Sequence, residues 1–191
     1  MDGGGSDAYN GFDGLDTVDF RYLAQGAIVN LASKVNGGSA AGESFYGIER
    51  IFGSSTGNDV LTAGNLAVIF SGFGGNDTLN GLAGDDALVG NDGHDALSGG
   101  IGNDRMTGGL GIDSFLFGEA GWGADRVADF QDGVDEIKVE DAIAASFAAF
   151  AVAGNGTATV TLTLTAAPAN TITLQSAGGN LNITAADFVF F

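Results

Sequence analysis

A nine-residue repeat constrains the fold of this chain more than any other feature of its sequence. From Ser54 to Leu116 the sequence divides without a slip into seven windows: SSTGNDVLT, AGNLAVIFS, GFGGNDTLN, GLAGDDALV, GNDGHDALS, GGIGNDRMT and GGLGIDSFL. Position 4 is Gly and position 6 is Asp in six of the seven, and position 8 is always Leu, Met or Phe. Two more windows, DGGGSDAYN and GFDGLDTVD, begin at Asp2 and Gly11. A period held over so many windows predicts a stack of equivalent structural units.

These windows resemble the RTX (hemolysin-type) calcium-binding nonapeptide, whose pattern is G-G-x-G-x-D-x-U-x. The resemblance implies an all-β chain that folds as a parallel β-roll (a β-helix), with two windows in each turn. Positions 1 to 6 of a window would form a loop, and positions 7 to 9 a short strand whose middle residue points inward. Several Ca²⁺ ions are the expected cofactor, with ligands at position 6 of the main and early windows: Asp59, Asp77, Asp86, Asp95, Asp104, Asp113, Asp7 and Asp16.

The residue types in the windows agree with this implied architecture. Glycine at positions 2 and 4 permits positive φ and a close approach of neighbouring backbones, which a six-residue metal-binding loop needs. A strand with one inward residue leaves a thin core, which is too small to offset the conformational entropy of the chain by itself. The expected core is a single line of apolar side chains: Leu61, Phe70, Leu79, Leu88, Leu97, Met106 and Phe115.

Calcium would supply the missing stability. Neighbouring strands lie about 4.8 Å apart, and Ca²⁺–oxygen distances are about 2.4 Å. An ion between two stacked loops therefore meets carboxylate and carbonyl oxygens from both loops. Without the ion, aspartates stacked at this spacing repel by about 3 kcal/mol per pair at an effective dielectric constant near 20.

The two sides of the roll are expected to bind calcium unequally. With two windows in each turn, the loops that begin at residues 54, 72, 90 and 108 stack on one side, and those at 63, 81 and 99 on the other. The first side has an unbroken column of aspartates and three expected ions. The second side has Val68, Asp86 and Asp104, so the gap beside Val68 should be weak or empty. Asp85, at position 5, is expected to point to solvent.

The sequence predicts three regions. Residues 1–53 hold partial repeats and one enlarged turn, in which AIVNLAS and SFYGIERIF are expected to form longer strands. Residues 54–116 form the roll, and residues 117–191 form a β-rich C-terminal cap. Asp129 and Asp135 are further candidate ligands, because the segment after the repeats resembles family segments that contribute carboxylates to terminal calcium sites. Residues 141–153 are expected to be helical, with Ile143, Phe147 and Phe150 on one face.

Composition narrows the classes of function. The chain has a net charge of −18, with 24 acidic and only six basic residues, so nucleic acid and anionic membranes are poor partners. Its apolar stretches are too short to insert into a membrane. The single histidine, His94, excludes an HExxH zinc helix, and Ser55 in a G-x-S-x-G match runs directly into a repeat window. We therefore do not expect this chain to be an enzyme, although an attached domain could be one.

Two functions remain open. The preferred one is a secreted calcium-binding module, outside the cell or on its surface, that folds on Ca²⁺ and supports type I secretion of an attached cargo domain. No N-terminal signal peptide is apparent, and the last five residues, DFVFF, resemble the C-termini that type I exporters read. The alternative is a polysaccharide-binding or adhesive module that resembles the R-modules of alginate epimerases. The scattered distribution of the basic residues weakens that alternative.

Overall fold

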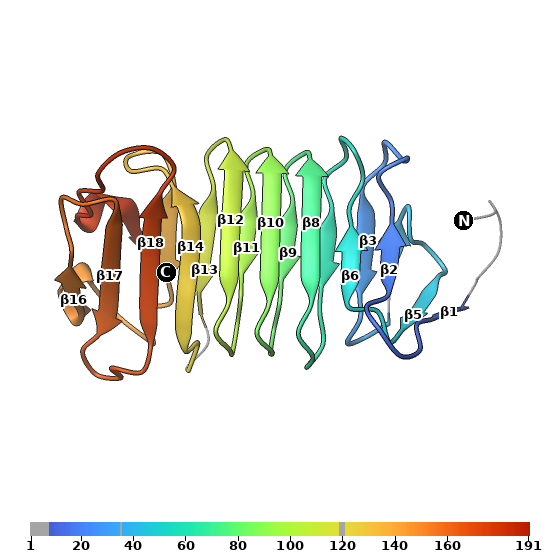
Figure 1. Ribbon diagram of the computed structural model, residues 1–191, viewed down its shortest axis with the longest axis horizontal. Coiled ribbons are helices and arrows are strands. Elements are labelled where there is room, and N and C mark those ends of the chain that lie inside the picture. Colours follow the sequence, from blue (N-terminus) through green and yellow to red (C-terminus); the bar gives the residue numbers. More distant parts are fainter. Residues whose placement is uncertain (1–7, 35, 119–120) are drawn as a thin grey trace.

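The computed structural model describes residues 8–34, 36–118 and 121–191. It is an elongated roll in which two parallel β-sheets face each other across one line of side chains (Figure 1). Asp7, a predicted ligand, lies outside the described residues. The prediction of an all-β parallel roll with a β-rich cap is confirmed.

The strands of the described residues form three sheets. The nine-stranded sheet contains, in spatial order, β16 (Phe150–Ala153), β17 (Thr159–Leu164), β18 (Thr171–Ser176), β14 (Ala124–Phe130), β12 (Arg105–Leu110), β10 (Ala87–Asp92), β8 (Ile69–Gly74), β6 (Arg50–Phe52) and β2 (Thr17–Asp19). The eight-stranded sheet contains β19 (Phe188–Phe190), β15 (Glu136–Val139), β13 (Ser114–Phe117), β11 (Ala96–Ser98), β9 (Thr78–Asn80), β7 (Val60–Thr62), β3 (Ala27–Asn30) and β4 (Gly37–Gly38). A small third sheet pairs β1 (Ala8–Asn10) with β5 (Ser44–Tyr46).

The strand register confirms two windows per turn. Ala87 of β10 pairs in parallel with Ile69 of β8 and with Arg105 of β12, each 18 residues away. The chain therefore crosses from one sheet to the other with each window and returns to the first sheet one layer further along. All seven residues of the expected core line are fully buried between the sheets.

Glycine is required where the loops turn. Position 4 has positive φ in five successive loops, for example 115° at Gly75 and 122° at Gly84. Position 2 also has positive φ in five successive loops, and three of these residues are not glycine: Phe73, Leu82 and Asn91. These three residues keep the left-handed conformation because the layers on both sides fix the backbone.

The region before the roll differs from the expectation of longer strands. The segment SFYGIERIF is divided into β5 and β6 by Gly47, whose φ of 58° turns the chain between them. β3 is four residues long, and it pairs in parallel with β7 as an ordinary layer of the roll. The additional residues form a loop that includes β4, which pairs antiparallel with β3.

The expected helix over residues 141–153 is wrong. Only a short 3₁₀-helix, η1 (Phe147–Ala149), is present there, and Ser146 before it has an extended backbone. Phe150 instead begins β16, which pairs antiparallel with β17. Phe147 and Phe150 both pack on Phe188. These two residues are therefore apolar because they contact the C-terminal cap, and not because they share one face of a helix.

The antiparallel strands β16, β17 and β18 close the C-terminal end of the nine-stranded sheet (Figure 1). A second 3₁₀-helix, η2 (Ala185–Asp187), leads into β19 at the edge of the eight-stranded sheet. Within the described part of the chain, no helix is long and apolar enough to cross a membrane.

Candidate metal centre

The aspartates at position 6 are buried where each loop enters its strand. Asp77, Asp95 and Asp113 form a column on the first side, and at most 2 % of each residue is exposed. In each case Oδ1 accepts the backbone N–H of the equivalent aspartate one turn earlier. The Asp59 N–H donates to Asp77 (2.8 Å), the Asp77 N–H to Asp95 (2.8 Å), and the Asp95 N–H to Asp113 (2.9 Å). This ladder fixes one oxygen of every carboxylate.

The second side repeats the arrangement and extends it by one aspartate. Asp86 accepts the N–H of Val68 (2.8 Å), and Asp104 accepts the N–H of Asp86 (2.8 Å). Asp125 then accepts the N–H of Asp104 at 2.9 Å. Asp125 was absent from the predicted ligand set. The sequence does contain a feature that could have identified Asp125 as a candidate ligand. Residues 125–127 are an aspartate, an arginine and an apolar residue, as are residues 104–106.

The second carboxylate oxygen of these aspartates is buried without a donor. Among the described residues, Oδ2 has no hydrogen-bond partner in six column residues: Asp77, Asp86, Asp95, Asp104, Asp113 and Asp125. A buried polar atom without a partner costs about 1–3 kcal/mol, and more if it is charged. Six of them in two columns indicate that a group other than the protein belongs beside these oxygens.

Backbone carbonyl oxygens converge on the same positions. A Cβ atom placed on Gly81 would lie 2.1 Å from Oδ2 of Asp86 and 2.5 Å from the carbonyl oxygen of Gly99 in the next layer. The position of Gly90 is equivalent, because its Cβ would lie 2.1 Å from Oδ2 of Asp95 and 2.6 Å from the Gly108 oxygen. Position 1 is therefore glycine because no side chain fits between the two oxygens. Two acceptors without a donor fit a cation.

The donor set is that of a hard cation. In the described ranges, no three His, Cys, Asp or Glu side chains lie close enough together to hold a metal. Each site would therefore have to combine carboxylates with backbone carbonyl oxygens from stacked loops. Ca²⁺ accepts such mixed oxygen ligands in a loose geometry of six to eight, so the residues fit this ion.

The electrostatics of the columns favour either a proton or a bound cation at these carboxylates. Burial raises the pKa of Asp77 and Asp86 to about 7 and that of Asp125 to about 8. Neighbouring carboxylates of the same column raise these pKa values further, as Asp104 does for Asp86. Removal from water likewise raises the pKa of the other buried position-6 aspartates: Asp59, Asp95, Asp104 and Asp113. A bound cation would reverse this preference for the protonated form.

Comparison with known proteins bears on the same residues. A family model described as the RTX calcium-binding nonapeptide repeat (four copies) matches residues 54–88, 71–106 and 81–115. Residues 54–115 are RTX calcium-binding repeats. Among solved structures, the chain is similar to a subunit of the mannuronan C5-epimerase of Azotobacter vinelandii, at 25% identity. The match covers 71% of this chain and 79% of that one, with a TM-score of 0.33. The comparison with curated proteins gives no match.

Four predicted ligands at the ends of the RTX columns lie in different surroundings. The oxygens of Asp59 accept from Ala27 N (2.6 Å) and Ser54 N (2.9 Å). Asp135 accepts from the N–H groups of Asp113 and Gln131, and Asp129 from those of Gly108 and Gly109. Oδ2 of Asp16, by contrast, is buried without a partner among the described residues. A calcium-binding role for these four aspartates stays a prediction, as it does for the other aspartates of the two columns.

Oδ2 of Asp59 has hydrogen-bond donors because the loop before it contains one more residue than the other loops. The N–H of Gly53 donates to the carbonyl oxygen of Ser71, and Gly53 thus continues the pairing of β6 with β8. Ile51 pairs with Phe70, 19 residues away, whereas Asp59 bonds Asp77, 18 residues away. The loop between them is thus one residue longer than the others. Ser54 is the additional residue, and its N–H and hydroxyl groups both donate to Oδ2 of Asp59.

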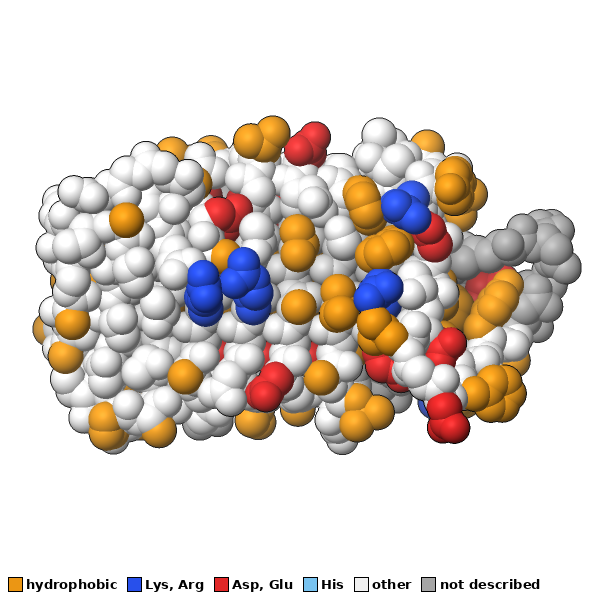
Figure 2. All heavy atoms as spheres, in the orientation of Figure 1, with side chains coloured by type: hydrophobic (Ala, Val, Ile, Leu, Met, Phe, Trp, Pro, Cys, Tyr) orange, Lys and Arg blue, Asp and Glu red, His pale blue; other side chains and the backbone are white. Residues whose placement is uncertain are grey.

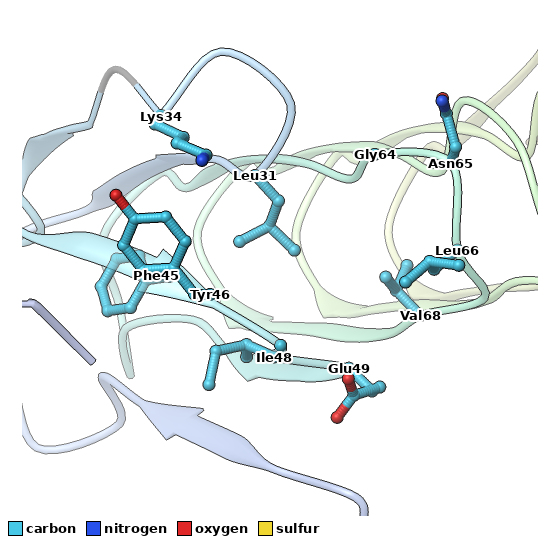
Figure 3. Close-up of a pocket in the computed structure, with 11 residues that line it drawn as sticks. Leu31, Lys34, Phe45, Tyr46, Ile48, Glu49, Gly64, Asn65, Leu66 and Val68 are labelled. Atoms are coloured by element: carbon cyan, nitrogen blue, oxygen red, sulfur yellow. The ribbon is translucent and has the colours of Figure 1, made fainter. Parts of the chain in front are cut away.

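Val68 ends the second column at an apolar hollow. Val68 lines it together with Leu31, Phe45 and Ile48 (Figure 3). The carboxylate at its rim, Glu49, accepts the N–H of Asp16 at 3.0 Å. The isopropyl group of Val68 offers no oxygen, so this layer lacks the charged ligand that its neighbours have.

Position 5 forms a second ladder outside the aspartate columns. Asp85 is exposed, as expected, but its Oδ1 also accepts the N–H of Asn103 at 2.9 Å. Asn58 and Asn76 accept from the next layer in the same way, and Nδ1 of His94 accepts the N–H of Ile112. Asp85 and His94 therefore take part in a repeated structural contact.

Proposed function

We propose that this chain is a secreted module whose roll folds when Ca²⁺ binds between its stacked loops. The observation that carries the proposal is the set of six buried Oδ2 atoms without a donor among the described residues. Calcium supplies the positive charge that cross-links neighbouring layers when bound. The residues that would hold it are Asp77, Asp95 and Asp113 on one side and Asp86, Asp104 and Asp125 on the other, completed by carbonyl oxygens. The layer of Val68 would bind weakly or not at all.

Folding and calcium binding are expected to be a single transition at neutral pH. Binding only to the folded state couples the two processes, and Mg²⁺ should substitute poorly because it requires octahedral geometry. Trp122, the only tryptophan, is buried and packs edge-on against Phe117 at 5.6 Å. Its fluorescence therefore reports on folding of the last layers.

A calcium titration tests this proposal. Circular dichroism and Trp122 fluorescence should change together from a coil signal in chelator to a β signal in millimolar Ca²⁺, and calorimetry should show several ions bound. A chelated sample at pH 7.5 with the full β signal and an unchanged melting temperature would contradict the proposal.

We also propose that the C-terminal tail is read by a type I exporter, which would carry the chain and an attached cargo domain out of the cell. In the folded chain Phe188 is buried and pairs with Ile137, whereas Val189 and Phe191 are exposed. Recognition of the whole tail would therefore have to precede folding. A low calcium concentration inside the cell would keep the chain unfolded until it is outside.

Removal of residues 187–191 is expected to stop secretion through a matching exporter, and secreted protein can be measured by immunoblotting. Because that deletion also removes Phe188 from the cap, the double substitution Val189→Ser/Phe191→Ser gives a cleaner test. It should lower secretion and leave the calcium midpoint of folding unchanged. Val134→Ser, at an exposed position outside the tail, is the matched control. Secretion of the double variant at the level of the control would refute the role of the tail.

A further inference from the structure

Acidic residues occupy the positions that follow Val68 toward the N-terminal end of the roll. On this side, the backbone carbonyl oxygen at each column position accepts the first N–H of the strand in the next layer. Val68 accepts from the first residue of β10 (2.9 Å), Glu49 from the first residue of β8 (2.7 Å), and Asp16 from the first residue of β6 (3.0 Å). The register therefore places Asp16, Glu49 and Val68 at three successive positions of one column.

Glu49 has the role that an aspartate has in the later layers. Its Oε2 accepts the N–H of Asp16 at 3.0 Å, as Oδ1 of Asp86 accepts the N–H of Val68 at 2.8 Å. Glu49 lies 33 residues after Asp16 and outside the nine-residue windows. A longer side chain thus supplies the same acceptor from a loop of different length. Figure 2 shows acidic side chains near the starts of β2 and β6.

The surroundings of Asp16 repeat the arrangement found around Gly81 in the main roll. Oδ2 of Asp16 is buried and has no hydrogen-bond donor among the described residues. A Cβ atom on Gly11 would collide with the carbonyl oxygen of Gly47 and would lie 2.7 Å from Cγ of Asp16. A Cβ atom on Gly47 would in turn lie 2.8 Å from the carbonyl oxygen of Gly11. Oxygen acceptors that converge without a donor fit a cation.

This group of oxygens is separate from the main columns. Because Val68 offers no oxygen, two strand spacings, about 10 Å, lie between the layers of Glu49 and Asp86. On the other side of the roll, both carboxylate oxygens of Asp59 already accept backbone N–H groups. An ion at the N-terminal end would therefore share no ligand with an ion further along the roll.

We propose that Asp16 and Glu49 bind a separate calcium ion, which orders the N-terminal layers independently of the main columns. Carbonyl oxygens of Gly11 and Gly47 would complete the ligand set, and Ca²⁺ accepts such mixed oxygen ligands in a loose geometry. The inference rests on the proposed function, because it requires that calcium binds between stacked loops of this chain.

The N-terminal layers can respond to calcium separately because they have packing and solvent access of their own. Phe45 meets Phe20 edge-on, with 6.2 Å between the ring centroids. A hollow lined in part by Gly11 and Asp16 gives an ion access from solvent. The chain would then have two calcium midpoints of folding, one for residues 8–53 and one for the main roll with its cap.

Calorimetry with calcium chloride and hydrogen exchange followed by mass spectrometry test the proposal. Glu49→Gln removes the charge but keeps an oxygen that can accept the N–H of Asp16. It should remove one ion from the tight binding class and raise the calcium midpoint of protection in residues 8–53 roughly tenfold, since calcium affinity depends on ligand charge. The calcium midpoint of Trp122 fluorescence should stay unchanged. Asp13→Asn, at an exposed position of the same window as Asp16, is the matched control and should behave like the unaltered chain.

Asp16→Asn should have the same effect as Glu49→Gln, and the double variant should lose no second ion, because both carboxylates hold one ion. An unchanged Trp122 signal shows that the main roll still folds in each variant. Equal ion counts in Glu49→Gln and Asp13→Asn, or a Trp122 midpoint that shifts together with that of residues 8–53, would overturn the separate site and leave the calcium module standing. If calcium folds no part of the chain, the proposed function fails, and the separate site fails with it.

Discussion

At pH 7.5 the calcium-free chain is expected to be unfolded, whereas at pH 5 the same calcium-free chain is expected to keep much of its β-structure. In the folded roll the pKa of Asp77 and of Asp86 is raised by burial to about 7, from an ordinary value of 3.8. Between these values the folded state binds protons that the unfolded state does not bind, so stability falls as the pH rises. Each pKa unit corresponds to about 1.4 kcal/mol, and several aspartates contribute.

The structure provides a place for these protons. Oδ2 of Asp86 and the carbonyl oxygen of Gly99 both lie close to the point that a Cβ on Gly81 would occupy, so we expect a proton on Oδ2 to be shared with that carbonyl oxygen. Protonation thus satisfies both acceptors and removes the repulsion along the column. Below pH 3.8 both states are protonated and no penalty remains. Above about pH 8, where Asp125 is also ionised, the penalty is complete.

Thermal melting followed by circular dichroism checks this expectation. Calcium should be removed by a chelating resin, because soluble chelators lose affinity for calcium in acid. With calcium present, the calcium midpoint of folding should move to higher concentration as the pH falls from 7.5 to 5.5, since protons and calcium compete for the same oxygens. A calcium-free roll whose stability rises with pH, or does not change, would contradict the burial of ionisable carboxylates in these columns.

Asp86→Asn is expected to have opposite effects with and without calcium. With calcium, loss of an anionic ligand should raise the calcium midpoint of folding by roughly tenfold, because calcium affinity depends on ligand charge. Without calcium at pH 7.5, the new amide can donate to Gly99 O where a carboxylate oxygen had no donor. That exchange should stabilise the calcium-free roll by about 1 kcal/mol or more. Urea unfolding in chelator and a calcium titration measure the two effects.

Asp85→Asn is the matched control in the adjacent residue. It removes the same charge, but Oδ1 of asparagine can still accept the N–H of Asn103, as Asn58 does for Asn76. Its calcium midpoint should stay close to that of the unaltered chain. If Asp85→Asn and Asp86→Asn shift the midpoint equally, calcium responds only to net charge and the proposed ligand positions are wrong.

The repeated part of the fold could be predicted because every window imposes the same local constraints. The core line and the two-window turn depend on position 8 and on the glycines, which the sequence shows directly. Asp125 could not be placed by counting, because 21 residues separate it from Asp104 where earlier layers are 18 apart. The one-residue insertion at Ser54 could not be found by counting either, because the uninterrupted windows begin at that residue and no window directly before it shows the usual spacing.

The remaining errors come from contacts between distant segments. The spacing of Ile143, Phe147 and Phe150 matched a helix, but β16 gains more from pairing with β17 and packing on Phe188. The expectation of scattered basic residues is a further case, because pairings over 18, 19 and 21 residues, which the sequence does not show, place three arginines on one row of the nine-stranded sheet: Arg50, Arg105 and Arg126.

The Oδ1 ladder gives the roll a direction. Each layer offers its backbone N–H groups to the carboxylates of the layer that follows it in the chain, and the last acceptors, Asp125 and Asp135, belong to the segments that lead into the cap. A chain that lacks those last layers would leave the amides of Asp104 and Asp113 without these acceptors, whereas a chain shortened from the other end would keep the position-6 amides of the remaining layers paired. The two ends of the roll are therefore not equivalent: the aspartate columns need an acceptor from the C-terminal segments, while the position-5 ladder runs the opposite way, from each layer to the one before it.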